Sequence, residues 1–220
     1  MRAARPSACA ARSVSCAAAG DGGRACERFR DRCREGRAPA LITYSALISA
    51  CEKAGESDSA FEVYDPQTDG WQPLAKMSTA RWALGLAAVG GKIYAIGGNY
   101  RGSTLDSVEA YDPQLGAWAP VASMSVERRY HASVVLDGKI YVMGGYRGGY
   151  LDTVEVYDPQ ADSWQRVASM PRGQSGHAAA AMGGKIYVTG KLHNCNKVEV
   201  YDPKTNTWAT APPMGTPRRL

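Results

Sequence analysis

The sequence predicts an all-β protein built from a repeated four-stranded unit, and two observations lead to this prediction. The 220 residues include 24 glycines and 12 prolines, which favours many short elements joined by turns. The tripeptide Tyr-Asp-Pro occurs four times, at intervals of 44 to 47 residues, which is typical of a repeat architecture. No apolar run approaches the roughly 18 residues that a membrane-spanning helix needs, so we expect no contact with a membrane.

The chain begins with a basic segment, residues 1–39, that we expect to be a disordered tail rich in arginine and alanine. Residues 1–40 hold nine arginines and four acidic residues, whereas the rest of the chain holds 17 bases and 17 acids. The formal charge of +5 therefore belongs to the tail, and the remainder gives no electrostatic reason to expect nucleic-acid binding. The first twenty residues contain three arginines, three serines and no acid, which fits an organellar transit peptide as well as it fits a disordered extension.

The cysteines indicate a reducing compartment. Four of the six lie in the tail, no Cys-x-x-Cys pair is present, and only Cys51 and Cys195 follow. We therefore expect a cytoplasmic protein, or an organellar one if the tail is a targeting signal. The spacing of Cys26 and Cys33, with no histidine nearby, gives no zinc site, and we expect no metal and no cofactor.

Residues 40–57 are predicted to form one short helix. Tyr44, Leu47, Ile48 and Cys51 follow a helical spacing, and Gly55 is a typical stop signal. The segment resembles the first helix and turn of a pentatricopeptide repeat, a family whose stacked hairpins bind single-stranded RNA, and this resemblance places Ser45 at a base-reading position. Since a single hairpin cannot bury its apolar face, we interpret the segment as a fragment and keep RNA binding as an alternative function.

Residues 58–220 contain the repeat. In its first complete unit the sequence predicts strands over 84–89, 92–96, 108–111 and 117–121. The pairs Gly-Gly and Asp-Gly suit a tight turn between the first two strands, and Asp-Pro suits a type I turn before the fourth. A tryptophan follows each Tyr-Asp-Pro tyrosine by seven positions, and we expect it to pack against the neighbouring unit. Such a unit is one blade of a β-propeller.

Several coupled positions identify the type of repeat. The segments 91–98 and 138–145 both read Gly-Lys-Ile-Tyr and end in Gly-Gly, and they alternate with the Tyr-Asp-Pro and tryptophan positions. This pattern resembles the kelch repeat, most closely the version in the kelch-like adaptors of cullin ubiquitin ligases. The resemblance implies a partial kelch propeller that binds a protein partner and has no enzymatic activity. The BTB and BACK regions of those adaptors are not found in these 220 residues, so a ligase role follows by analogy alone.

The number of units is too small for a closed ring. Two strands near 61–74 and three complete units make about three and a half blades, whereas kelch rings have six or seven. We expect either a fragment of a longer protein or copies that associate to complete the ring, because an open arc exposes apolar flanks.

The varied loops form one rim of the predicted propeller, and we expect the partner to bind there. With four antiparallel strands, the second-to-third-strand loops and the inter-blade connections emerge on this rim. Arginine and tyrosine, which are enriched at binding hot spots, are frequent in these loops. The candidate partner-binding residues are Arg81, Tyr100, Arg101, Arg128, Arg129, Tyr130, Tyr146, Arg147, Tyr150, Arg172 and His193.

Within this set the resemblance implies that Arg129 grips an acidic partner peptide. The equivalent positions in the other units hold Trp82 and Ser175, which argues against one shared acidic pocket. Packing or turn contacts are the alternative role for Arg81 and Arg128.

An enzymatic function is the remaining alternative, because some kelch propellers are sugar oxidases or sialic-acid mutarotases. The sequence has three histidines, and His131 and His177 share a repeat position with Leu84, which favours a buried role. No phosphate-binding loop or nucleophile motif is present, so we predict no catalytic residues.

Overall fold

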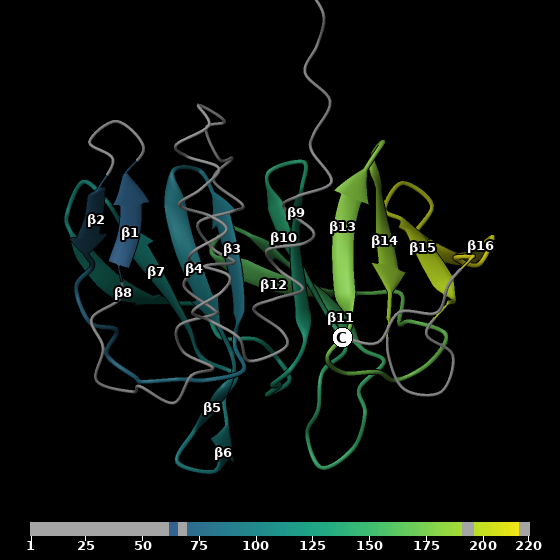
Figure 1. The fold of residues 1–220 in the computed structure, drawn as a ribbon, viewed down its shortest axis with the longest axis horizontal. Coiled ribbons are helices and arrows are strands. Elements are labelled where there is room, and N and C mark those ends of the chain that lie inside the picture. Colours follow the sequence, from purple (N-terminus) through teal and green to yellow (C-terminus); the bar gives the residue numbers. More distant parts are fainter. Residues whose placement is uncertain (1–61, 66–69, 191–195, 216–220) are drawn as a thin grey trace, which may run out of the picture. The chain divides into compact units, whose positions relative to one another are not determined.

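The computed structural model describes residues 62–65, 70–190 and 196–215, and within these residues the regular structure is entirely β (Figure 1). The chain divides into two compact units, Met1–Leu74 and Ala75–Leu220. The tail predicted for 1–39 and the helix predicted for 40–57 lie outside the described residues and stay predictions. In the described part, no helix has the length and apolarity needed to cross a membrane.

The first unit contains the two strands predicted near 61–74. They are β1 (Glu62–Asp65) and β2 (Gly70–Pro73), and they pair antiparallel with Tyr64 opposite Trp71. The same tyrosine–tryptophan register recurs in the later units, for example between Tyr111 and Trp118. The hairpin therefore has the register of the third and fourth strands of a blade.

The second unit contains, within its described residues, three four-stranded antiparallel sheets, as the repeat predicts. The first sheet is formed by β3 (Gly85–Val89), β4 (Lys92–Ile96), β7 (Val108–Asp112) and β8 (Ala117–Val121). The second is formed by β9 (Ala132–Leu136), β10 (Lys139–Met143), β11 (Val154–Asp158) and β12 (Ser163–Val167). The third is formed by β13 (Ala178–Met182), β14 (Lys185–Thr189), β15 (Val198–Asp202) and β16 (Thr207–Ala211).

Each sheet is folded by the turns that the sequence predicts. Asp137 and Gly138 both have positive φ, of 50° and 74°, which matches the right-handed twist of the strands that they join. At the β11–β12 turn, the Asp158 carboxylate accepts a hydrogen bond from the Gln160 backbone N–H at 2.9 Å. Lys139 also pairs with Asp158 at 2.9 Å, and both groups are partly exposed. The ion pair joins the two tight turns of the second sheet, which lie at the same end of that sheet.

The hydrophobic core lies between successive sheets. On β10, Ile140 and Val142 pack with the first sheet, whereas Tyr141 and Met143 pack with the third. Both faces of the middle sheet are therefore buried, because successive residues of a strand point to opposite faces. The first strands of the three sheets, β3, β9 and β13, lie next to one another (Figure 1). This arrangement is that of consecutive propeller blades and confirms the predicted fold class.

The tryptophans join each sheet to its neighbour. The indole N–H of Trp164 on β12 donates to the backbone oxygen of Ala122, 2.7 Å away at the end of the preceding sheet. Trp208 on β16 makes the same contact with Ala168 at 2.8 Å. The predicted inter-blade packing is thus present, but these indoles are half-buried because they lie on the outermost strand.

Candidate functional site

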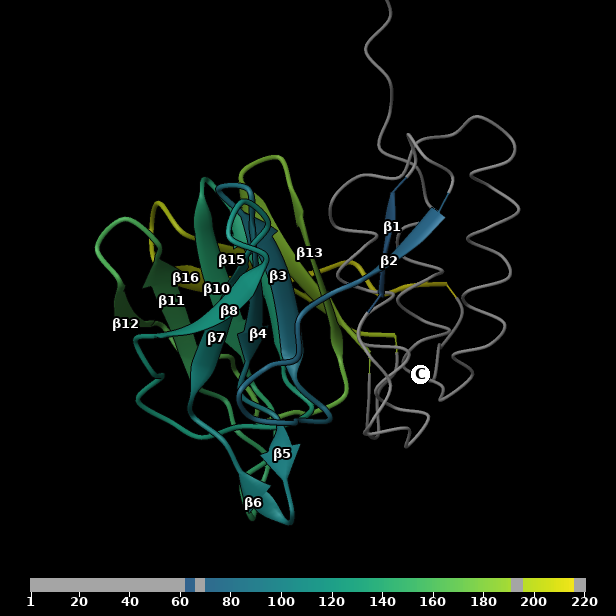
Figure 2. The ribbon, with the colours of Figure 1, turned by 90° about the vertical axis from the view of Figure 1, so that its left-hand side faces the viewer.

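The loops opposite the tight turns form a surface that we call the rim. It consists of residues 97–107 and 144–153, which link second to third strands, of the segment 75–84 before β3, and of the inter-sheet connections 122–131 and 168–177. A two-stranded hairpin of β5 (Asn99–Tyr100) and β6 (Ser103–Thr104) projects from it (Figures 1 and 2). The sequence did not predict this hairpin.

Backbone hydrogen bonds between loops from different sheets make the rim rigid. The Tyr130 N–H donates to the Ala83 oxygen at 2.9 Å, and the Gly176 N–H donates to the Tyr130 oxygen at 2.7 Å. The Gly98 N–H likewise donates to the Arg128 oxygen at 2.9 Å. The rim is therefore tied together across the sheets before any partner binds.

Two of the predicted binding residues, Arg81 and Arg128, are not available at the surface. The Arg128 side chain is fully buried, and its guanidinium donates to the Glu155 carboxylate at 2.7 Å and to the Gly144 oxygen at 2.7 Å. Arg81 is paired with Glu109 in the same way, at 2.7 Å. Their assignment to the partner-binding set was wrong, because a cation this far from water needs an internal carboxylate and cannot reach a partner. The structural role that the sequence left open is the correct one.

The carboxylates of these pairs also fix the connecting segments. Ser78 donates its backbone N–H and its hydroxyl to Glu109, both at 2.8 Å, so that the segment before β3 is bound to β7. Burial alone would raise the pKa of Glu109, but the hydrogen bonds from Ser78 and Arg81 outweigh it and hold that pKa below its ordinary value. In the next sheet, Ser125 and Glu155 form the corresponding contact at 2.8 Å.

The third sheet lacks this arrangement. Gln174 and Pro171 stand where the earlier units have arginine and serine, and a proline has no backbone N–H to donate. The Oε2 atom of Glu199 is buried and has no hydrogen-bond partner, and burial raises the pKa of this carboxyl. Glu199 therefore lacks the arginine and serine donors of the two earlier sheets, and the nearby charges of Arg172 and Lys197 offset its burial only in part.

Arg129, one residue after the buried arginine, lies in a cluster of aromatic rings. Its guanidinium carbon is 5.4 Å from the ring centre of Tyr146 and 5.9 Å from those of Trp82 and Tyr130. Trp82 and Tyr130 meet edge to face at 5.7 Å. The side chain is half-buried, its Nε atom has no hydrogen-bond partner, and among the described residues no carboxylate lies within ion-pair distance of it. Arg129 is thus a positioned cation that has no counter-ion in the part of the chain that the structure describes.

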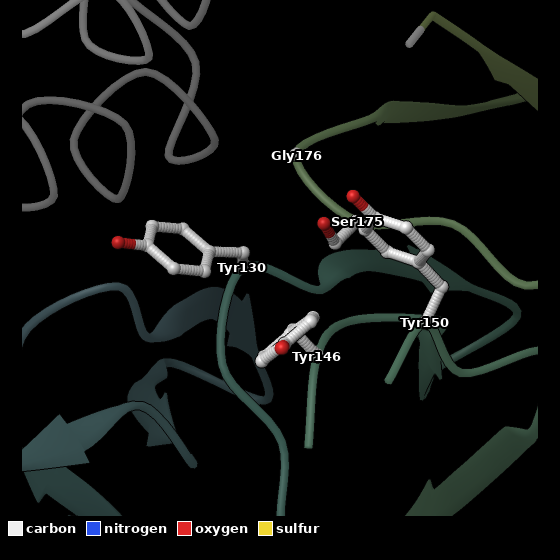
Figure 3. Close-up of a pocket in the computed structure, with 5 residues that line it drawn as sticks. All are labelled: Tyr130, Tyr146, Tyr150, Ser175 and Gly176. Carbon is white, nitrogen blue, oxygen red and sulfur yellow. The ribbon is translucent and has the colours of Figure 1, made fainter. Parts of the chain in front are cut away.

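A small pocket adjoins this cluster. It has a volume of about 250 Å³ and is lined by Tyr130, Tyr146, Tyr150, Ser175 and Gly176 (Figure 3). Tyr146 and Tyr150 meet edge to face at 5.7 Å. The rim connections of two neighbouring sheets and the loop between β10 and β11 contribute these residues, so the pocket exists because the sheets are held together.

The other predicted residues are more dispersed. Arg101 lies over the Tyr100 ring at 5.1 Å, on the β5–β6 hairpin. Arg147 is exposed and pairs with Glu127 at 2.7 Å, which neutralises its charge locally. Arg172 is exposed near Glu199, and His193 lies outside the described residues.

Sequence reasoning missed Trp82 and Ser175 as members of the site. Both share a repeat position with Arg129, which places all three on the rim. The repeat therefore indicated that an arginine, a tryptophan and a serine lie at equivalent places on the rim.

His131 and His177 are buried, as their shared position with Leu84 predicts, and neither ring has a hydrogen-bond partner among the described residues. Burial holds the pKa of His131 well below its ordinary value and lowers the pKa of His177 to about 4. The His177 ring packs against Gly144, where an added Cβ would lie 2.6 Å from its Cε1 atom. Among the described residues, no three His, Cys, Asp or Glu side chains are grouped to hold a metal ion.

Comparison with known proteins agrees with this architecture. A family model described as the kelch motif matches residues 83–125, 127–171 and 175–215, one match for each four-stranded sheet. The chain is also similar to human Kelch-like protein 5, with 51% identity over 37 residues. That match covers 17% of this chain and 5% of the human protein, so the chain corresponds to a small part of that relative. Because the kelch matches together span more than half of its residues, the chain belongs to the kelch-repeat family.

Proposed function

We propose that this protein is an interaction module whose rim binds an extended acidic segment of a partner protein. The observation that carries the proposal is Arg129, a half-buried cation that three aromatic rings hold in place and that has no carboxylate partner among the described residues. A carboxylate from a partner would supply the missing counter-ion, and arginine binds carboxylates through two parallel hydrogen bonds.

The surroundings of Arg129 favour binding over catalysis. The site combines arginine, tryptophan and tyrosine, which are the residue types that dominate binding energy at protein interfaces. The fixed loops reduce the entropy that is lost when a partner is ordered on the rim. Membership of the kelch-repeat family supports the same function. The resemblance of the repeat to that of the kelch-like adaptors extends the proposal to substrate recognition for a ubiquitin ligase.

Charge reversal on the rim tests the proposal. A display library of random 12-residue peptides is selected on the full chain, and binding is then measured for the double variant Arg129→Glu/Arg147→Glu. We expect the selected peptides to be rich in Asp and Glu and the double variant to lose their capture, because two cations become anions. The melting temperature should stay unchanged within a few degrees, since neither side chain belongs to a buried ion pair.

Lys204→Glu is the control, because it reverses one positive charge at the β15–β16 turn, on the side opposite the rim. It should leave capture intact. Undiminished capture of acidic peptides by the double variant would refute the assignment of the rim.

A further inference from the structure

Tyr130 occupies a backbone conformation that disfavours its own side chain. Its φ is +55°, in the left-handed region, where a bulky residue is strained. The same repeat position is held by Ala83, with a φ of +53°, and by Gly176, with a φ of +61°. The fold thus requires left-handed backbone here, and glycine meets the requirement without strain.

Packing does not account for a tyrosine at this position. Tyr130 is 41% exposed, and its ring contacts the Trp82 ring and the guanidinium of Arg129 on the surface of the rim. A strained residue that contributes little to the core is the kind of outlier that points to function. Tyr130 instead lines the tyrosine pocket, together with Tyr146, Tyr150, Ser175 and Gly176.

The chemistry of this pocket limits its occupant. Its walls present aromatic rings, and Arg129 lies over two of them, so a cationic side chain would be repelled. A carboxylate would lose its hydration among the rings. The volume of about 250 Å³ suits one compact side chain and not a helix. An uncharged side chain remains, and among these a proline ring packs on tyrosine faces in the way that aromatic-lined grooves bind proline-rich segments.

The hydroxyl groups of the pocket fit the backbone of such a segment. A polyproline II strand makes no internal hydrogen bonds, so its carbonyl oxygens are free to accept. The hydroxyls of Tyr150 and Ser175 are directed to the same side of the pocket (Figure 3). Arg129 next to the rings then sets the position of an acidic residue relative to the proline.

We infer that the tyrosine pocket binds a proline ring of the partner segment, with an acidic residue within about two positions of that proline held by Arg129. This inference rests on the proposed function and specifies the partner as an extended, proline-containing acidic peptide. Tyr130 is then a specificity-determining residue that is retained despite its strained backbone.

The experiment uses the peptide library selected on the full chain, with three variants. Tyr130→Gly introduces the residue type that the chain has at the equivalent position 176. Tyr150→Ala removes a pocket side chain from a residue that is 54% exposed. Leu115→Ala is the control, because this side chain is 78% exposed on the side opposite the rim. Affinities are measured for the best acidic peptide and for copies of it with Pro→Ala or with Glu→Gln.

We expect the selected peptides to carry proline near their acidic residue. We expect each single change to weaken binding about tenfold or more, whether it is Pro→Ala in the peptide or Tyr130→Gly or Tyr150→Ala in the protein. A peptide change combined with a protein change should weaken binding no more than either alone, because both remove the same contact. The melting temperature of Tyr130→Gly should not fall, since glycine relieves the strain.

Two results together would overturn the inference and leave the proposed function intact: the selected acidic peptides lack proline, and they bind Tyr130→Gly and Tyr150→Ala with the same affinity as the unmodified chain. Peptides whose affinity is unchanged by Arg129→Glu would instead refute the proposed function. Weakened binding by Tyr130→Gly together with a lowered melting temperature would show a structural role for this residue, and Tyr150→Ala then decides whether the pocket binds the peptide.

Discussion

His131 and His177 share one repeat position, and both should make the free energy of unfolding depend on pH. Both rings are buried without hydrogen-bond partners, and the equivalent Leu84 is buried as well. A buried histidine without a partner stays neutral because burial disfavours the charged form. In the unfolded chain the same side chains take up protons at their ordinary pKa of about 6.5.

The free energy of unfolding should therefore decrease as the pH falls below about 6.5. The folded pKa of His177 is about 4, so between the two values the unfolded state binds more protons than the folded state. The loss should reach roughly 2 kcal/mol for each buried histidine between pH 7.5 and pH 5. Urea unfolding across this range measures it. His177→Leu, which copies the residue at the equivalent position 84, should remove about half of the loss, and an unchanged pH profile in this variant would contradict the prediction.

Other groups contribute in different pH ranges or with the opposite sign. Glu109 has a lowered pKa, so its contribution to stability is lost below about pH 4.5. The pKa of Glu199 is raised, which makes its contribution fall as the pH rises past its ordinary value. The comparison between histidine and leucine variants cancels both.

The connecting segment before each sheet depends on the carboxylate that it meets. In the second sheet, Arg128 and Ser125 both bind Glu155, so the connection between β8 and β9 is attached to β11. In the third sheet, Glu199 has lost these donors, although it occupies the same position in the strand. We therefore expect Glu155 to stabilise its sheet and the equivalent Glu199 not to stabilise the third.

Substitution of the two glutamates should reveal this difference. Glu155→Gln leaves the fully buried Arg128 guanidinium without a counter-charge and should cost about 3–5 kcal/mol. Glu199→Gln removes a carboxylate that burial already disfavours, so the free energy of unfolding at pH 7 should stay the same or rise. Chemical denaturation of both variants measures the two values. Equal losses from both substitutions would contradict the role given to Arg128.

At the level of strands, the sequence predicted the structure closely. The prediction of 84–89 and 108–111 corresponds to β3 (Gly85–Val89) and β7 (Val108–Asp112), because the turns between them require particular residues at particular positions. The β5–β6 hairpin was not predicted, since two-residue strands carry no detectable alternation.

The roles of neighbouring arginines were harder to predict. Arg128 and Arg129 are adjacent, but one is buried and the other faces the rim. The burial of Arg128 depends on Glu155, which lies 27 residues later, and no local pattern reports such a pair. The repeat does contain a signal, because Arg81 and Arg128 each lie four positions after a methionine and 28 or 27 residues before the glutamate that they bind.

Across the second unit, the two faces of a sheet differ in burial according to whether another sheet covers them. In the middle sheet, Val154 and Val156 are buried under the third sheet. The equivalent Val198 and Val200 of the third sheet are half-buried. Met182 on β13 is 64% exposed. The flank of β13–β16 therefore exposes apolar residues at positions that are covered in the repeat before it.

We expect this flank to mediate association between copies of the chain, since an uncovered apolar sheet face favours contact with another apolar surface. Light scattering of the full chain should give at least about twice the 23.5 kDa of one copy. Val200→Asp should restore the mass of a single copy, because it places a charge at the centre of the flank, where the equivalent Val156 packs against the next sheet. Leu115→Asp, on an exposed turn, is the control and should leave the mass unchanged. A single-copy mass for the unmodified chain at high concentration, or an oligomer that tolerates Val200→Asp, would exclude association through this face.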